Sequence, residues 1–169
     1  MIFLKTVGTL ILAICPIIFG IGHSMSLKLN QNQIEKIIQL INWFINEIKF
    51  CQNSVQTIVK NCCKQAQFKN LDFLKKVEQN MEKMPFPVAW EKAIGSWQCS
   101  LTYDDKNLLK SLAQILGAFD AKGQISALEH AKFRFEESFQ NAKKQCEKKC
   151  NLSKSLGILT SLAIYIILI

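Results

Sequence analysis

The chain has 169 residues, of which 49% are hydrophobic and 20% are charged, and its formal net charge is +8. This length accommodates one domain and excludes a chain of several large domains. The charge is segregated, because residues 6–27 and 155–169 contain no Asp, Glu, Lys or Arg and therefore form two apolar ends around a basic middle.

The first apolar end predicts a transmembrane helix over residues 1–24. A helix from Ile2 to Gly22 is about 30 Å long at ~1.5 Å per residue, which matches the hydrocarbon core of a bilayer. Pro16 is tolerated in such a helix. The alternative is a cleaved signal peptide, which requires a more basic start than the single Lys5 and a small-residue cleavage site.

Residues 25–152 are expected to form a cytoplasmic helical bundle, and residues 153–169 a second transmembrane helix. Residues 156–169 alone span only ~21 Å. A start at Leu152, with the Lys154 ammonium reaching the headgroups, gives a nearly sufficient span. A buried core helix is the alternative, but such a helix does not usually finish as an unbroken apolar terminus.

The lysine distribution predicts the orientation of the two expected spans. Only Lys5 precedes the first span, whereas lysines follow it and cluster before the second: Lys28, Lys36, Lys143, Lys144, Lys148, Lys149 and Lys154. The positive-inside rule therefore places the middle domain in the cytoplasm and both termini outside it. Without Lys5, 20 basic and 13 acidic residues remain, a net charge of +7. This charge favours anionic lipid as a partner; no aromatic-basic interleaving indicates specific nucleic-acid binding.

Hydrophobic periodicity predicts helices throughout the middle. Residues 31–51 form an amphipathic helix with one apolar stripe. The members of this stripe are Ile34, Ile37, Ile38, Ile41, Phe44, Ile45, Ile48 and Cys51. Asn53 and Gln56 have the form of a capping box, so a second helix is expected to start at Asn53. A third helix is expected over residues 67–84, because the following Pro85 and Pro87 cannot continue it.

Another helix is expected to begin at Pro87, which suits a first helical turn. Trp90, Ala93, Ile94 and Trp97 recur at helical spacing and indicate a core stripe rather than a ligand site. Further along, Thr102 and Asp105 predict the N-cap of a helix that extends to Leu116, and the longest helix is expected over residues 121–150. These elements predict an all-α, antiparallel bundle of about six helices.

The sequence contains no recognisable catalytic, cofactor-binding or metal-binding motif. No phosphate-binding loop, Gly-x-Ser-x-Gly or His-Glu-x-x-His string occurs. The seven cysteines are an odd number, and six fall in the expected cytoplasmic part, where thiols stay reduced. Cys146 and Cys150 share a helix face, but zinc requires two more ligands. We therefore expect no enzyme activity, no metal and no cofactor.

The stretch LGAFDAKGQ, residues 116–124, separates two helical patterns. Gly117 can adopt the left-handed conformation that ends a helix, and Asp120 can accept hydrogen bonds from the first N–H groups of the next. Two interpretations remain open: a tight hairpin, or a surface presented to a partner. The candidate residues of this motif are Gly117, Phe119, Asp120, Lys122 and Gln124.

The chain resembles the stage III sporulation protein AB family of endospore-forming bacteria. The resemblance rests on the helix from Ile34 to Ile48, on Trp90, on the turn motif with Leu128 four residues after Gln124, and on Ser155-Leu156-Gly157. Together with the two apolar ends, these features cover nearly the whole chain. One departure is Asn53-Ser54-Val55, where the family usually has Thr-Pro-Leu.

This resemblance implies a component of the channel-like complex between mother cell and forespore. It implies a two-pass protein of the mother-cell membrane around the forespore, with a cytoplasmic domain similar to that of the F subunit of type II secretion systems. The expected role is a non-enzymatic scaffold, and the expected partners are other membrane proteins of the complex and a cytoplasmic ATPase. A basic membrane-tethered module that binds anionic lipid or nucleic acid is the alternative.

Overall fold

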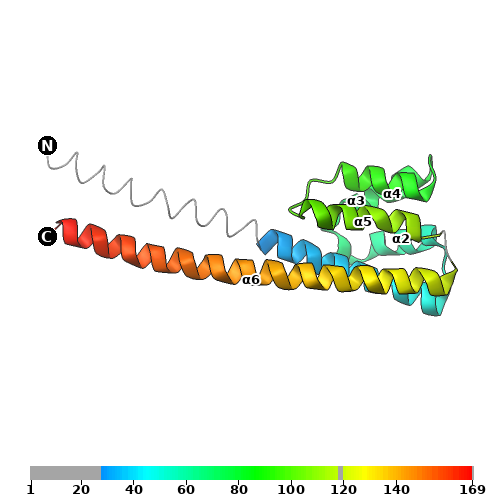
Figure 1. The fold of residues 1–169 in the computed structure, drawn as a ribbon. Coiled ribbons are helices and arrows are strands. Elements are labelled where there is room, and N and C mark those ends of the chain that lie inside the picture. Colours follow the sequence, from blue (N-terminus) through cyan, green and yellow to red (C-terminus); the bar gives the residue numbers. More distant parts are fainter. Residues whose placement is uncertain (1–27, 118–119, 169) are drawn as a thin grey trace. The chain divides into compact units, whose positions relative to one another are not determined.

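The computed structural model describes residues 28–117 and 120–168 (Figure 1), with side chains described up to residue 148. This part of the chain is all-α, with six α-helices and no strand among the described residues. The chain divides into two compact units, of which Asn30–Gln140 is one. This unit contains the bundle and is described here by itself.

The first helix covers residues 28–46 and continues without a break into the π-helix η1 (Glu47–Cys51). Five further α-helices follow, with a short 3₁₀ turn η2 (Ala66–Phe68) after the first of them. Their bounds are α2 (Val55–Lys64), α3 (Phe73–Met81), α4 (Phe86–Gly95), α5 (Tyr103–Ile115) and α6 (Ala121–Leu168). The last helix passes through residue 152 without interruption.

The prediction of one helix over residues 67–84 was wrong. The structure has η2, a turn and then the shorter α3. Phe68 and Phe73 are both buried. In a continuous helix these two side chains, five residues apart, would point roughly 140° away from each other. The turn between them lets both side chains reach the core.

The predicted cap of the second helix was wrong by one residue. Ser54 is the N-cap of α2, and its Oγ accepts a hydrogen bond of 3.4 Å from the backbone N–H of Thr57. Asn53 instead donates from Nδ2 to Glu47 Oε2, at 2.6 Å. Asn53 does not cap α2 because its side-chain amide is bonded to Glu47 of the preceding helix, and the next residue, Ser54, provides the cap.

The core is built around Trp90 of α4, as the helical spacing predicts. The ring of Trp90 is 1% exposed and lies 5.4 to 6.1 Å, between centroids, from the rings of Phe44, Phe73 and Phe86. Its indole Nε1 donates a 2.8 Å hydrogen bond to the carbonyl of Leu109 in α5. One side chain therefore joins the first helix, α3, α4 and α5.

The expected stripe of the first helix is confirmed at most of its positions. Six of its members are buried: Ile34, Ile37, Ile41, Phe44, Ile45 and Ile48. Ile38 is half-buried, and Cys51 is exposed, contrary to the prediction. Cys51 leaves the stripe because the π-helical turn at Glu47–Cys51 winds more widely than an α-helix and shifts the register of its last residues.

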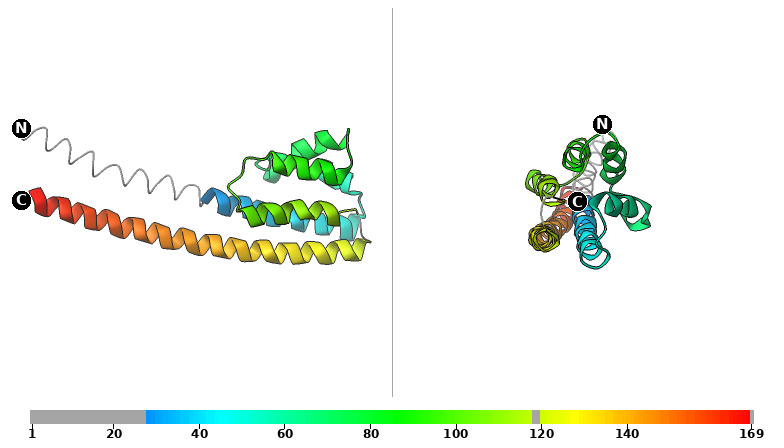
Figure 2. Two further views of the ribbon diagram at one scale, coloured as in Figure 1. Left: turned by 45° about the horizontal axis from the view of Figure 1, so that its top comes forward. Right: turned by 90° about the vertical axis from the view of Figure 1, so that its right-hand side faces the viewer.

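The chain direction alternates from one helix to the next through the bundle (Figure 1). The connections after the first helix, after α3 and after α5 therefore meet at one end of the unit, and those after α2 and α4 meet at the other. The first helix and the beginning of α6 lie side by side and antiparallel, as both views of Figure 2 show. This arrangement agrees with the predicted antiparallel bundle.

Two hydrogen bonds show which end holds the first and last residues of the unit. Gln33, near the start of the first helix, accepts a 2.8 Å bond at Oε1 from the backbone N–H of Ser100, between α4 and α5. Ser138 of α6 donates a 2.6 Å bond from Oγ to Oδ1 of Asp105, in the first turn of α5. The unit therefore begins and finishes at the end where α4 connects to α5.

No helix in the described part of the chain is both long enough and apolar enough to cross a membrane. The expected span over residues 1–24 lies outside the described residues. The same holds for the side chains of residues 149–169, which include the expected second span.

Candidate functional site

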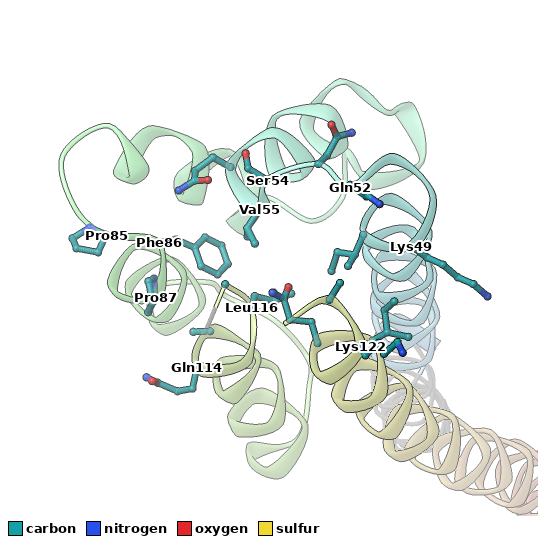
Figure 3. Close-up of a pocket in the computed structure, with 18 residues that line it drawn as sticks. Lys49, Gln52, Ser54, Val55, Pro85, Phe86, Pro87, Gln114, Leu116 and Lys122 are labelled. Atoms are coloured by element: carbon teal, nitrogen blue, oxygen red, sulfur yellow. The ribbon is translucent and has the colours of Figure 1, made fainter. Parts of the chain in front are cut away.

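A cleft of about 1020 Å³ opens at the end of the bundle where the first helix, α3 and α5 connect to their successors (Figure 3). We call it the end cleft. The residues that line it are Ile48, Lys49, Gln52, Asn53, Ser54, Val55, Gln56, Pro85, Phe86, Pro87, Ala113, Gln114, Leu116, Gly117, Ala121, Lys122, Gln124 and Ile125. The cleft is thus assembled from three connections that are far apart in the sequence.

The inner surface of the end cleft is apolar. Val55 and Phe86 point into it from two different helices, and Leu116 lies at its base (Figure 3). Phe86 and Leu116 are 7% and 3% exposed, so both also belong to the core. The cleft is therefore an opening onto the core and not a separate cavity.

Gly117 ends α5 with a backbone conformation that favours glycine. Its φ is +88°, in the left-handed region, as the sequence predicts. A Cβ placed at this position would lie 3.9 Å from Cγ2 of Val55, which is ordinary van der Waals contact. The need for glycine here comes from the backbone angle and not from a lack of space.

Asp120 caps α6, also as predicted. Its Oδ1 accepts a 3.2 Å hydrogen bond from the backbone N–H of Gly123, and its carbonyl accepts one of 3.0 Å from the N–H of Gln124. The carboxylate also lies at the positive end of the helix dipole. Asp120 is committed to this turn and is not among the residues that line the end cleft.

The structure separates the five candidate residues into three groups. Gly117, Lys122 and Gln124 line the end cleft. Asp120 holds the turn that positions them, whereas Phe119 lies outside the described residues. The turn has the geometry of a hairpin, and it also contributes one side of an open cleft.

The opposite side of the end cleft comes from η1, which the sequence analysis missed. Gln52 follows this π-helix with a φ of +51°, which is uncommon for a residue other than glycine. Single π-helical turns occur frequently at functional sites. The sequence signal was weak, since it consisted only of a polar interruption after Cys51.

Two lysines stand at the rim of the end cleft. The ammonium of Lys49 extends away from the cleft (Figure 3) and lies 5.3 Å from the ring centroid of Phe50, whose side chain is 72% exposed. Lys122 lies on the α6 side of the rim and is exposed. Among the described residues, no Asp or Glu lines the cleft, although Glu91 accepts a 3.0 Å hydrogen bond from the lining residue Gln114.

The cysteines of α2 have the properties of structural residues. Burial, followed by the adjacent Cys63 and Glu47, raises the pKa of Cys62 from 9.0 to about 12. Burial and a hydrogen bond to Glu78 likewise raise the pKa of Cys63 to about 12. Both thiols therefore stay protonated near neutral pH, whereas a nucleophilic cysteine needs a lowered pKa. Among the described residues, no three His, Cys, Asp or Glu side chains are grouped as a metal site would require.

Comparisons with known proteins give one result. The description of the matching family model is stage III sporulation protein AB, and the match covers residues 5–169, almost the whole chain. No curated protein and no solved structure matches the chain. The chain therefore belongs to the stage III sporulation protein AB family, which gives it a role in sporulation.

Proposed function

We propose that this protein is a non-enzymatic scaffold in the membrane complex that connects mother cell and forespore, and that it acts beside a cytoplasmic ATPase. Family membership supports the sporulation role. The end cleft supports a scaffold, because three connections far apart in the sequence form a surface that is open to a partner. In this proposal the fold of the bundle is similar to the cytoplasmic domain of the F subunit of type II secretion systems.

The observation that carries this proposal is the separation of the two ends of the bundle. The unit begins and finishes at the end where α4 connects to α5, as the bonds from Ser100 to Gln33 and from Ser138 to Asp105 indicate. The end cleft lies at the opposite end, where the first helix, α3 and α5 connect to their successors (Figure 3). The end cleft is thus opposite to the end at which the chain enters and leaves the bundle unit, so the connections toward the two expected spans leave it open to a cytoplasmic partner.

Deleting the gene in its spore-forming host tests the scaffold role. We expect sporulation to stop at engulfment while vegetative growth continues, and an intact copy of the gene should restore spores. Normal spores from the deletion strain would refute the proposed function.

The proposed topology has its own test. A reporter that is active only in the cytoplasm should stay silent when it is fused after Ile169, and it should be active when it is inserted in the exposed turn after Asn70. A strong signal from the fusion after Ile169 would show that the last segment does not cross the membrane.

A further inference from the structure

We infer that the end of the bundle opposite the end cleft carries a surface for anionic lipid headgroups, formed by Lys64, Lys69 and Lys75. We call it the basic end. This inference rests on the proposed membrane anchoring, and it adds a second attachment of the domain to the bilayer through its own surface.

Charge is concentrated in the stretch that forms this surface. Residues 55–76 contain five lysines and one carboxylate, Asp72, so this short stretch accounts for +4 of the chain's net charge of +8. Lys64, Lys69 and Lys75 are all exposed. None of the three ammonium groups has a hydrogen bond or an ion pair in the described part of the chain, so their charge is available to an external partner.

The position of these lysines in the fold can be established from their neighbours. Lys64 ends α2 and Lys69 follows η2, so both lie in the connection from α2 to α3. The next lysine, Lys76, lies at the start of α3, and its Nζ is 3.4 Å from Oγ of Ser96, just after α4. The basic end therefore lies beside the connection from α4 to α5.

This is the end at which the unit begins and finishes. Ser100 of the same connection donates its N–H to Gln33 of the first helix. In the sequence, only eight residues separate Gln33 from the expected first span, which ends at residue 24, and fourteen separate Ser138 from the expected second span, which begins at residue 153. The three lysines thus lie on the side of the bundle from which the chain continues toward both apolar ends.

Attraction between exposed lysines and anionic headgroups is electrostatic and therefore depends on salt. Salt screens it over a Debye length of about 10 Å at 0.1 M and about 3 Å at 1 M. Attraction to anionic lipid should therefore act at low salt and disappear at high salt.

Lysine acetylation of the full chain in lipid nanodiscs tests this inference. Discs of neutral phosphatidylcholine are compared with discs that contain 40% phosphatidylglycerol, and acetylation with an amine-reactive ester is measured for each lysine by mass spectrometry. Lys49 and Lys122 are the matched internal controls, because they are exposed but lie at the rim of the end cleft, at the opposite end.

We expect acetylation of Lys64, Lys69 and Lys75 to slow at least three-fold in anionic discs at 50 mM salt and to recover at 0.5 M salt, with Lys49 and Lys122 unchanged. Equal rates in both lipids would overturn the inference, as would equal slowing at both ends, which would show diffuse attraction to the whole domain.

The charge-reversed variant Lys64→Glu/Lys69→Glu/Lys75→Glu provides a second arm. In this variant, acetylation is measured at Lys60 and Lys76, which are exposed residues of the same stretch. Their acetylation rates should be the same in neutral and in anionic discs. Retained sensitivity of these two lysines would count against the basic end.

The nanodisc experiment also separates this inference from the proposed function. Co-purification of the chain with the discs reports membrane anchoring by itself, and sporulation of the deletion strain reports the scaffold role. If the chain co-purifies with the discs but its basic end is acetylated equally in both lipids, only the inference is overturned. Normal spores from the deletion strain would overturn only the scaffold role.

Discussion

Ser138 and Asp105 are joined by a 2.6 Å hydrogen bond between the serine Oγ and Oδ1 of the carboxylate, across thirty-three residues of sequence. Asp105 is only 4% exposed, and its Oδ2 also accepts a 2.6 Å bond from the hydroxyl of Thr102. The same Thr102 Oγ1 caps α5 by accepting from the N–H of Asp105. One buried carboxylate thus completes a helix cap and attaches α5 to α6.

Ser138→Ala should destabilise the bundle, because it removes one of two side-chain donors from a buried carboxylate. We expect a loss of about 1.5–3 kcal/mol, the range for hydrogen bonds to charged groups. The matched control is Ser111→Ala, since the Oγ of Ser111 donates only to the carbonyl of Leu108 in its own helix, at an exposed position. The measurement is urea unfolding of the full chain in detergent micelles, and equal stability of the two variants would contradict this account.

The two tryptophans Trp90 and Trp43 should respond differently to replacement by phenylalanine. Trp90→Phe removes the 2.8 Å hydrogen bond to Leu109 and leaves a gap among three aromatic rings, so we expect a cost of about 2–3 kcal/mol. The Nε1 of Trp43 is buried and has no hydrogen-bond partner in the described structure. Trp43→Phe therefore removes an unsatisfied donor and should cost less than half as much. The same unfolding experiment tests this order, and the reverse order would contradict it.

Sequence patterns predicted the features of this bundle that depend on neighbouring residues. The spacing of Trp90, Ala93, Ile94 and Trp97 indicated a core stripe, and all four are buried. The Thr102 cap was also predicted, because a cap involves residues three apart.

The features that escaped prediction arise from pairings between distant residues. The bond from Ser138 to Asp105 depends on the packing of two helices, which no local pattern encodes. The end cleft combines three connections that only the alternating chain direction brings together. The π-helix η1 also escaped, because its residues follow the same apolar spacing as the α-helix that precedes it.

Gly117→Ala should destabilise the bundle, whereas Gly95→Ala should not. Gly117 has a φ of +88°, and a left-handed conformation costs a residue with a Cβ about 1–2 kcal/mol. Gly95 is the last residue of α4, has no positive φ, and a Cβ there would meet nothing within 4 Å. Alanine at position 95 should be neutral or stabilising, since it reduces the conformational freedom of the unfolded chain. Thermal unfolding of both variants provides the test, and a stable Gly117→Ala variant would contradict the hairpin geometry.

Cys62 should resist alkylation in the folded chain. At pH 8 its thiol is almost entirely protonated, because burial raises its pKa to about 12 and only the thiolate is nucleophilic. Cys51 is exposed and should react with iodoacetamide first. Intact and peptide mass spectrometry of the chain in micelles distinguishes the two residues, with urea-unfolded chain as the control in which both react. Equal rates in the folded chain would show that α2 is more open than the structure indicates.

The same thiols should make the bundle sensitive to alkaline pH. The unfolded chain releases these protons near pH 9, whereas the folded chain holds those of Cys62 and Cys63 until about pH 12. Between these values the folded state binds more protons, so the free energy of unfolding falls as pH rises. Under reducing conditions, the free energy of unfolding of the wild-type chain should therefore fall relative to that of Cys62→Ala/Cys63→Ala as the pH rises from 8 to 10.5. A constant difference would contradict the raised pKa values.

Lys122→Glu separates the two interpretations of the turn at residues 116–124. Lys122 is exposed at the rim of the end cleft, so reversal of its charge should leave the melting temperature within about 2 °C of the wild-type value. If a partner of the proposed scaffold binds at the end cleft, this variant should reduce spore formation at least ten-fold. Lys60→Glu is the matched control, since Lys60 is also exposed but lies outside the cleft, and it should make normal spores. If the Lys122→Glu variant is stable and makes normal spores, the partner-binding interpretation is contradicted. The turn is then a hairpin alone, because Gly117 and Asp120 already account for its geometry.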